Sequence, residues 1–479
     1  MKQKFVWNLF LIVILNLLIK PFYIIGIDAE VINRVGLTEY GNYFALINFS
    51  FLFNIVLDCG IINYNTRNIA QHNFLLEKYF SGIITLRLLL VIFYLLITIL
   101  MSLLLGYRLY DLKILILLSF NQVIVAFILY LRSNFSALHY FVTDSIVSIL
   151  DRLLLILICS ILLWGNLTNS IFKIEWFVFS QTVSYLFTFL ICIYLTSKKI
   201  KYLKIKLSVP LALVILKKSF PYAALILMMT IYYRSDSIML DRLIDDNSLQ
   251  AGIYAQAYRF FEASNMLAYL FAALLLPILS TMLKNRNKIN EIVYCSFRVI
   301  MVFAISLSIF SIFYSIEIMD LRYDRNLIES SKIFIVLMIS FLFVSSTYIF
   351  GTLLTANGEM YKLNMVAFFG VILNIFLNFI LIPKLFAFGS AIASLFTQSV
   401  TGIAQFIICY HIFNFKMKKI FYKIFLFSAI LLGVTFILDQ YFDSLITVFI
   451  LYGFFSVLLT VKLKLITLSD FKFIVNNKV

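Results

Sequence analysis

Apolar stretches of about 20 residues recur along the whole 479-residue chain, separated by short polar segments. A helix of that length crosses the hydrocarbon core of a bilayer, which is about 30 Å thick. Hydrophobic residues make up 63% of the sequence and charged residues only 13%, which leaves no segment for a separate soluble domain. We therefore expect an all-α, polytopic membrane protein.

We place about fourteen transmembrane helices in the sequence. Their expected ranges are residues 5–27, 41–63, 79–106, 112–131, 141–164, 171–196, 212–240, 250–276, 293–315, 332–356, 361–382, 388–412, 420–438 and 444–464. The first run has no small-residue cleavage site behind a short apolar core, so we interpret it as a retained helix and not as a signal peptide.

Positive charge alternates between successive loops. The loop after the sixth span contains Lys198, Lys199, Lys201, Lys204, Lys206, Lys217 and Lys218, whereas the next loop carries Asp241, Asp245 and Asp246. Because basic loops stay in the cytoplasm, we predict that both termini are cytoplasmic and that the protein lies in a bacterial inner membrane. The net charge of +16 then reflects loops that face anionic lipids, and it does not indicate a nucleic-acid partner.

Cysteine and histidine are scattered through the sequence. The cysteines are Cys59, Cys159, Cys192, Cys295 and Cys409, and the histidines are His72, His139 and His411. Neither set has the spacing of a disulfide framework or of a metal site. We therefore predict no metal and no cofactor, and we interpret the cysteines as small packing residues.

The chain also repeats itself. Residues 180–199 align with residues 397–416, where Gln181 meets Gln398 and Cys192 meets Cys409, and residues 41–49 align with residues 252–260. These matches pair the sixth span with the twelfth and the second with the eighth, which preserves orientation. We expect two pseudo-symmetric six-helix lobes at 1–197 and 219–415, a basic cytoplasmic connector at 198–218, and two appended helices with a cytoplasmic tail at 416–479.

The start of each lobe resembles Wzx-type polysaccharide flippases. In the first lobe the resemblance rests on Pro21, Val35-Gly36, Tyr40-Gly41, Asp58-Cys59-Gly60 and Arg67-Asn68-Ile69-Ala70. In the second lobe it rests on Pro221, Asp236, Gly252, Tyr254 and Ala257. Each motif is degenerate, and Cys59 stands where the family more often has a bulky apolar or aromatic residue.

The resemblance implies a flippase of the multidrug/oligosaccharidyl-lipid/polysaccharide (MOP) exporter superfamily, with two helical bundles around a central cavity. It implies a transporter and not an enzyme, and it implies an undecaprenyl-diphosphate-linked oligosaccharide as substrate. Such a repeat unit of O-antigen, capsule or exopolysaccharide would move from the cytoplasmic to the periplasmic leaflet by alternating access. Polymerase and chain-length proteins of the same pathway, together with membrane lipids, would be its partners.

Ionisable residues inside the spans are the candidate site, because a diphosphate needs compensating charge while it crosses a bilayer. The candidate cavity cations are Lys20, Arg87, Arg152, Arg234 and Arg259, and the supporting or ion-coupling acids are Asp58, Asp144, Asp151, Asp236 and Glu262. Each would cost about 2.5–3.5 kcal/mol at the centre of a lipid-facing helix. We therefore expect them to face protein or water.

Several of these charges have a second interpretation. Arg87 and Arg298 lie near a cytoplasmic end and could snorkel to it, and Arg259 and Glu262 could neutralise one another three residues apart. In the fifth span Asp144, Ser148 and Asp151 are expected to form a polar stripe beside Arg152 that faces the cavity. Lys20 precedes Pro21, which is expected to break the first helix.

In the seventh span Thr230, Arg234, Ser237 and Asp241 fall on one helical face. We expect Arg234 to point to the cavity between the lobes; snorkelling or pairing with Asp241 is the alternative. Asp236 lies off this face and is expected to bond to the neighbouring helix of its own lobe.

Two other functions remain open at this stage. A cation-coupled multidrug exporter of the same superfamily would share the fold and would use Asp58, Asp144 or Asp151 to bind the coupling ion. A membrane glycosyltransferase or polysaccharide polymerase would share the hydrophobicity, but the longest outward loop, about 16 residues by the span map, is short for catalytic groups.

Overall fold

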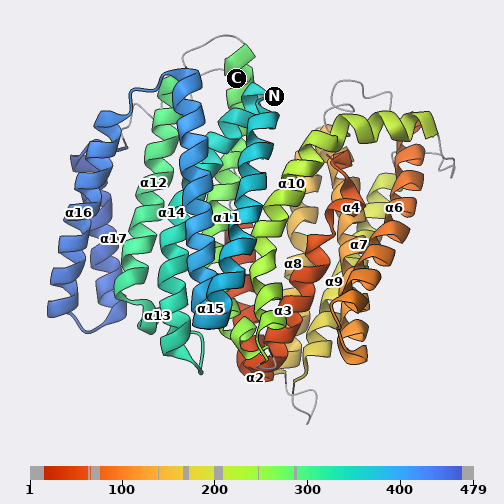
Figure 1. Cartoon of the computed structure of the whole chain (residues 1–479), viewed down its shortest axis with the longest axis horizontal. Helices are drawn as coiled ribbons and strands as arrows, with labels where there is room; N and C mark the ends of the chain where they lie inside the picture. Colours follow the sequence, from red (N-terminus) through yellow and green to blue (C-terminus); the bar gives the residue numbers. More distant parts are fainter. Residues whose placement is uncertain are drawn as a thin grey trace. The chain divides into compact units, whose positions relative to one another are not determined.

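The computed structural model describes residues 16–62, 65, 76–138, 140–165, 172–198, 209–245, 248–284 and 289–466. These residues form helices and short connections, and none of them lies in a β-strand (Figure 1). The predicted motif at 67–70, residues 5–15 of the first span, His72, His139 and the lysine-rich residues 199–206 lie outside the described residues.

The described chain divides into two compact units, Met1–Ala255 and Gln256–Val479. The first contains η1 (Phe22–Asp28), α2 (Ala29–Val35), α3 (Leu37–Leu52), α4 (Ile55–Asp58), α6 (Leu76–Leu104), α7 (Leu109–Ala137), α8 (Phe141–Trp164), α9 (Ile174–Ser197) and α10 (Val209–Leu243). α11 (Leu249–Lys284) begins in the first unit and continues in the second. The second further contains α12 (Ile289–Phe313), α13 (Ser315–Asp320), α14 (Leu327–Asn357), α15 (Met360–Phe413), α16 (Lys418–Tyr441) and α17 (Leu445–Lys462).

Eleven described segments are long and apolar enough to cross a membrane. One of them, Met360–Phe413, joins two helices across a kink at Phe386, and its halves correspond to the expected spans 361–382 and 388–412. The all-α, multi-pass architecture is thus confirmed. The total of fourteen spans stays a prediction, because α10 is not among the eleven and the first helix begins outside the described residues.

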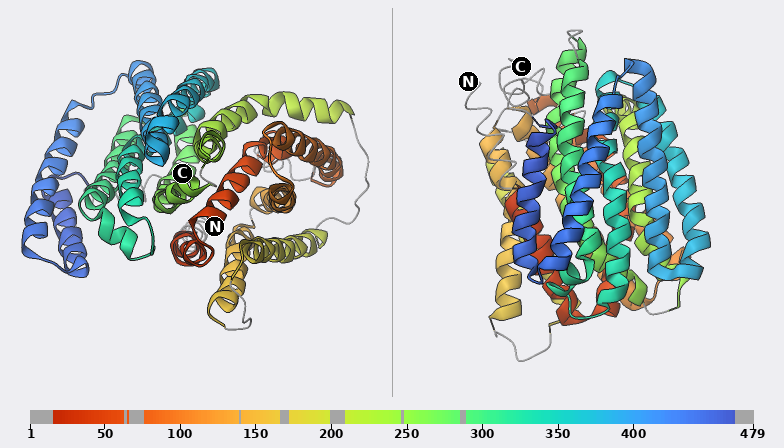
Figure 2. Two further views of the ribbon diagram at one scale, coloured as in Figure 1. Left: turned by 60° about the horizontal axis from the view of Figure 1, so that its bottom comes forward. Right: turned by 90° about the vertical axis from the view of Figure 1, so that its left-hand side faces the viewer.

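α10 packs along α3 and so belongs to the first compact unit, although the repeat assigns it to the second lobe. Its first part passes over the ends of α4 and α6, where Ala212 and Leu216 pack on the core of the first lobe (Figures 1 and 2). Residues 209–218, expected in the connector, are therefore helical, because their apolar face finds a partner on the lobe. The predicted lobe boundaries divide the sequence by its repeat and stay a prediction.

Pro21 does not break the first helix, so that expectation is wrong. Pro21 has helical φ and ψ of −62° and −37°, and the next seven residues form a π-helix, Phe22–Asp28. The helix therefore continues through the proline, and a π-helical segment follows it. The helix goes on as α2 to Val35, eight residues beyond the expected end at residue 27, and is capped by Gly36, whose φ of +88° favours glycine.

The helix of the expected second span is interrupted near its C-terminal end. α3 stops at Leu52, a turn follows, and the four-residue α4 ends at Cys59, which has a left-handed φ of 46°. Gly60 has a φ of 76° and lies so close to α10 that an added Cβ would be 2.9 Å from the carbonyl oxygen of Ser219. The Asp58-Cys59-Gly60 motif thus ends a helix where another helix crosses.

The two C-terminal helices pack on α12. Tyr452 of α17 donates a hydrogen bond of 2.6 Å to the carbonyl of Ser306, and the Oγ atoms of Ser306 and Ser456 lie 2.9 Å apart. One face of α16 is buried, with Phe427 and Leu431 fully covered.

Candidate functional site

A cluster of charged and tyrosine side chains lies inside the first unit, between the first helix, α8 and α9. Nη1 of Arg152 donates to the hydroxyl of Tyr185 over 3.1 Å, and its guanidinium lies 4.8 Å from the centre of the Tyr23 ring. Nε of Arg152 is 3.8 Å from Oδ2 of Asp151. Lys20, half-buried on the first helix, interacts electrostatically with both Arg152 and Asp151.

The cluster continues toward α7. Nε of Arg132 binds Oδ1 of Asp144 over 2.7 Å, and Nδ2 of Asn16 donates to Oγ of Ser148 over 3.3 Å. The expected polar stripe of α8 is therefore present and faces the first helix and α7. Arg132 escaped the sequence analysis because it follows the last residue of the expected span 112–131.

We define the first-lobe cluster as Lys20, Tyr23, Arg132, Asp144, Asp151, Arg152 and Tyr185. Three basic and two acidic side chains leave it with a formal charge of +1. The side chains of Arg152 and Asp151 keep 27% and 20% of their surface exposed, and those of Arg132 and Asp144 keep 22% and 14%. A partly open, net positive group flanked by tyrosines can bind an anion and hydrogen-bond to sugar hydroxyls.

Beside this cluster the first lobe buries a further carboxylate that the sequence analysis did not select. Asp28, at the end of the π-helix, is 1% exposed and accepts a hydrogen bond of 2.8 Å from the hydroxyl of Tyr40. Asp28 lies one residue beyond the expected first span, 5–27, and is therefore not among the candidate residues inside the spans.

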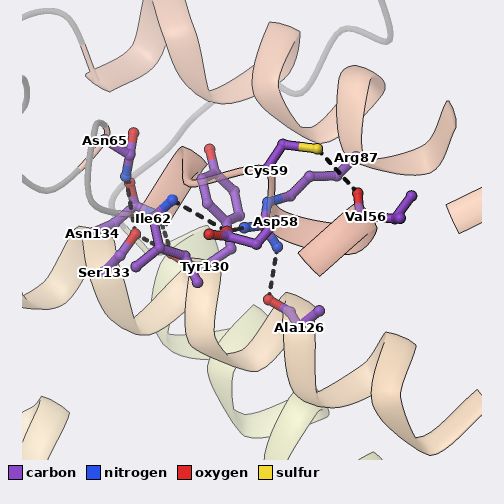
Figure 3. Close-up of polar contacts among 10 residues, drawn as sticks. All are labelled: Val56, Asp58, Cys59, Ile62, Asn65, Arg87, Ala126, Tyr130, Ser133 and Asn134. Carbon is purple, nitrogen blue, oxygen red and sulfur yellow. Dashed lines mark hydrogen bonds and ion pairs between the residues drawn. The ribbon is translucent and has the colours of Figure 1, made fainter. Parts of the chain in front are cut away.

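Arg87 and Asp58 form an ion pair in the core of the first lobe (Figure 3). Arg87 is 1% exposed; its Nη1 donates to the carbonyl of Ala126 over 2.8 Å, and its guanidinium lies 4.8 Å from the centre of the Tyr130 ring. Asp58 also accepts from the backbone N–H of Ile62 over 3.2 Å. The pair therefore joins α4, α6 and α7.

This placement differs from both interpretations of Arg87. A snorkelling arginine would end at the membrane surface, and a cavity cation would keep part of its surface open, whereas Arg87 is enclosed by protein. Removing one partner of such a pair leaves a buried charge uncompensated. We therefore interpret Arg87 and Asp58 as structural groups and omit both from the proposed substrate site.

Arg234 lies on α10 and faces α3. Its Nη1 donates to Oδ1 of Asn48 over 2.9 Å, and its guanidinium stands 4.9 Å from the centre of the Phe51 ring. Asp241, the alternative partner, instead binds Nη2 of Arg242 over 2.6 Å. Within the first unit, Arg234 thus adds a cation at the packed surface of α3 and α10.

The acidic residue two positions after Arg234 is buried. Asp236 is 2% exposed, and its Oδ2 accepts a hydrogen bond of 2.9 Å from the hydroxyl of Tyr254 at the start of α11. This bond to the neighbouring helix is the one expected from the sequence.

In the second unit two of the expected charges, those of Arg259 and Glu262, neutralise each other. Nη1 of Arg259 lies 2.7 Å from Oε2 of Glu262, three residues along α11. Nε of Arg298 donates to the carbonyl of Tyr294, one turn earlier on its own helix, over 3.3 Å. Among the described residues no group of three or more His, Cys, Asp or Glu side chains is placed to hold a metal ion.

The helical fold and its membrane-embedded charges define a multi-pass membrane protein, and comparison with known proteins specifies its family. Residues 6–283, more than half of the chain, match the family model described as "Polysaccharide biosynthesis protein". The chain belongs to this family. No curated protein matches the sequence significantly.

Solved structures show the same fold. The lipid II flippase MurJ in an inward closed conformation is 17% identical, covers 96% of this chain and 97% of its own, and superposes with a TM-score of 0.75. An inward-facing multidrug resistance MATE transporter of the MOP superfamily is 14% identical, covers 82% of this chain and 96% of its own, and has a TM-score of 0.64. A MOP superfamily transporter from Pyrococcus furiosus is 14% identical, covers 84% and 94%, and has a TM-score of 0.57. The chain therefore shares the fold of these three proteins.

Proposed function

We propose that this protein is a flippase for undecaprenyl-diphosphate-linked oligosaccharides, the repeat units of O-antigen, capsule or exopolysaccharide. It moves them from the cytoplasmic to the periplasmic leaflet of the inner membrane by alternating access, without chemical change. Membership of a polysaccharide biosynthesis family and a fold shared with a lipid II flippase support this proposal. The observation that carries it is the net positive first-lobe cluster.

The roles of its residues follow from their contacts. Arg152 and Lys20 compensate the diphosphate, because both are basic and the arginine offers a planar donor fork. Tyr23 and Tyr185 hold the arginine from two sides and keep its fork oriented. Asp151 lowers the net charge, so that the bound anion can leave again.

Arg234, on α10, is the second cation that we propose to contact the substrate. Asn48 positions its guanidinium through the hydrogen bond of 2.9 Å. Arg259 takes part less directly, because Glu262 already compensates its charge.

A cation-coupled multidrug exporter is the second candidate, favoured by the similarity to a MATE transporter. Its coupling ion would need an available carboxylate. The three expected carboxylates each face an arginine instead: Asp58 faces Arg87, Asp144 faces Arg132 and Asp151 faces Arg152. Ion pairing of these three groups favours the flippase, and Asp28, which accepts a hydrogen bond from Tyr40, is the carboxylate that a drug exporter would use instead.

The test uses cells in which this protein is the sole source of the activity. Arg152→Ala is expected to accumulate normally, to abolish surface polysaccharide and to leave the lipid-linked repeat unit on the cytoplasmic leaflet, while Arg152→Lys retains part of the activity. Arg34→Ala is the matched control, since Arg34 is an arginine of the same lobe with 49% of its side chain exposed. Normal surface polysaccharide from Arg152→Ala at matched protein level would overturn the role of this cluster.

A further inference from the structure

Four chain segments that the charge pattern assigns to the outer side meet in the first unit. They are the start of α3, the residues just before α7, the end of α10 and the start of α11. All residues involved belong to Met1–Ala255. Their contacts have no part in the first-lobe cluster.

Two glycines bring the starts of α3 and α11 into backbone contact. A Cβ added to Gly41 would lie 2.7 Å from the backbone nitrogen of Gly252 and would overlap the carbonyl oxygen of Ser248. A Cβ added to Gly252 would lie 2.8 Å from the carbonyl carbon of Leu37. Gly41 and Gly252 occupy equivalent positions in the internal repeat, so the contact is reciprocal.

A polar network lies beside this crossing. Asp241, at the end of α10, binds Nη2 of Arg242 and accepts a hydrogen bond from Oγ of Ser248. The Asp241 side chain is only 3% exposed. The Arg242 guanidinium in turn lies 3.8 Å from the centre of the Tyr107 ring, between α6 and α7. Ser248 itself has a left-handed φ of 68°, which turns its carbonyl toward Gly41.

The same end of α3 is tied to α7 by a second interaction. Nδ2 of Asn42 donates to Oδ1 of Asp111 over 2.8 Å, and Oδ2 of Asp111 accepts from the backbone N–H of Arg108 over 3.2 Å. Asp111 is 8% exposed. The part of the first lobe that receives α11 is therefore fixed within the lobe, and the first residues of α11, among them Ala251 and Ile253, are buried.

We propose that Gly41, Gly252, Tyr107, Asp241, Arg242 and Ser248 form an outer latch that holds the start of α11 on the first lobe and opens when substrate leaves. The inference rests on the proposed flippase function for its purpose, because a bulky oligosaccharide cannot pass between helices whose backbones touch. Its chemistry suits repeated opening. Hydrogen bonds can exchange their protein partners for water at small net cost once the helices separate.

The test is labelling by a membrane-impermeant maleimide added from outside. The reporter is Leu37→Cys, at a side chain 6% exposed, in a Cys59→Ser background, since the other four cysteines are buried. The reference is Asp324→Cys, at an exposed position in the predicted outer connection between α13 and α14. We expect the reporter to react much more slowly than the reference.

Gly252→Ala, Asp241→Asn and Ser248→Ala are each expected to raise reporter labelling, by about tenfold or more for Asp241→Asn, because an uncompensated partner remains. Gly433→Ala is the matched control, since a Cβ there would meet nothing within 4 Å. Labelling of the reporter as fast as the reference, or no increase in any variant that accumulates, overturns the latch. Labelling needs no transport, so failure of the latch and failure of the flippase proposal are distinguishable.

Discussion

Breaking the buried ion pair of the first lobe should destabilise the protein far more than breaking an exposed one. Arg87→Met removes a guanidinium that is 1% exposed and leaves the carboxylate of Asp58, whose side chain is 19% exposed, without its cation. Loss of one partner of a buried pair costs about 3–5 kcal/mol. For a cooperative unit of some 200 residues this corresponds to a fall in Tm of about 6–20 °C.

The assay is thermal unfolding of the purified protein in detergent, with a double-mutant cycle. Arg87→Met combined with Asp58→Asn removes both charges, so the double variant should regain more than half of the loss. Arg34→Ala is the control: its ion pair with Glu30 is half-exposed and should change stability by less than about 1 kcal/mol. A fall in Tm for Arg87→Met no larger than that of the control, or strictly additive effects in the cycle, would refute the reasoning.

Three further predictions concern single positions. Phe386→Gly should raise the free energy of unfolding by about 1 kcal/mol in the same thermal assay, because Phe386 has a φ of 54° and a side chain that is nearly half exposed; a decrease would show that its packing outweighs backbone strain. Tyr254→Phe should lower the amount of protein in the membrane on immunoblots, because the buried carboxylate of Asp236 loses a donor, and unchanged levels would contradict that role. Arg234→Ala should accumulate normally and reduce surface polysaccharide, with Arg234→Lys intermediate; wild-type polysaccharide from the alanine variant would exclude the arginine from the substrate path.

Hydropathy and charge were enough to predict the membrane class, most spans and the set of embedded charges, because a bilayer restricts which segments can cross it. They were not enough to predict which face of each helix packs against other helices. Arg87 and Arg152 both lie inside apolar runs, yet one is enclosed with Asp58 and the other stays partly open beside Tyr185. Burial of a side chain depends on which neighbour packs on that face, and a single sequence does not contain that information.

The local backbone conformation was predicted less well at a residue that can either end a helix or lie within it. Proline usually ends a helix, but Pro21 keeps helical dihedral angles, and the π-helix Phe22–Asp28 that follows carries Asp28 into the core. The pairing of Arg132 with Asp144 was missed because Arg132 follows the last residue of the expected span 112–131. By contrast, helix periodicity placed Asp236 off the polar face of its helix and predicted a bond to the neighbouring helix, but it did not identify Tyr254 as the partner.

The central claim is that an anionic, lipid-linked sugar crosses the membrane through this protein with the help of first-lobe cations. The most direct measurement uses purified protein in liposomes that contain a fluorescent undecaprenyl-diphosphate sugar, and follows the fraction of lipid reached by a quencher added outside. The wild-type protein and Arg34→Ala are expected to equilibrate the lipid between leaflets, and Arg152→Ala is expected to fail. Absence of lipid movement by the wild-type protein, together with ion-driven efflux of a cationic dye from the same liposomes, would contradict the account and favour the drug exporter.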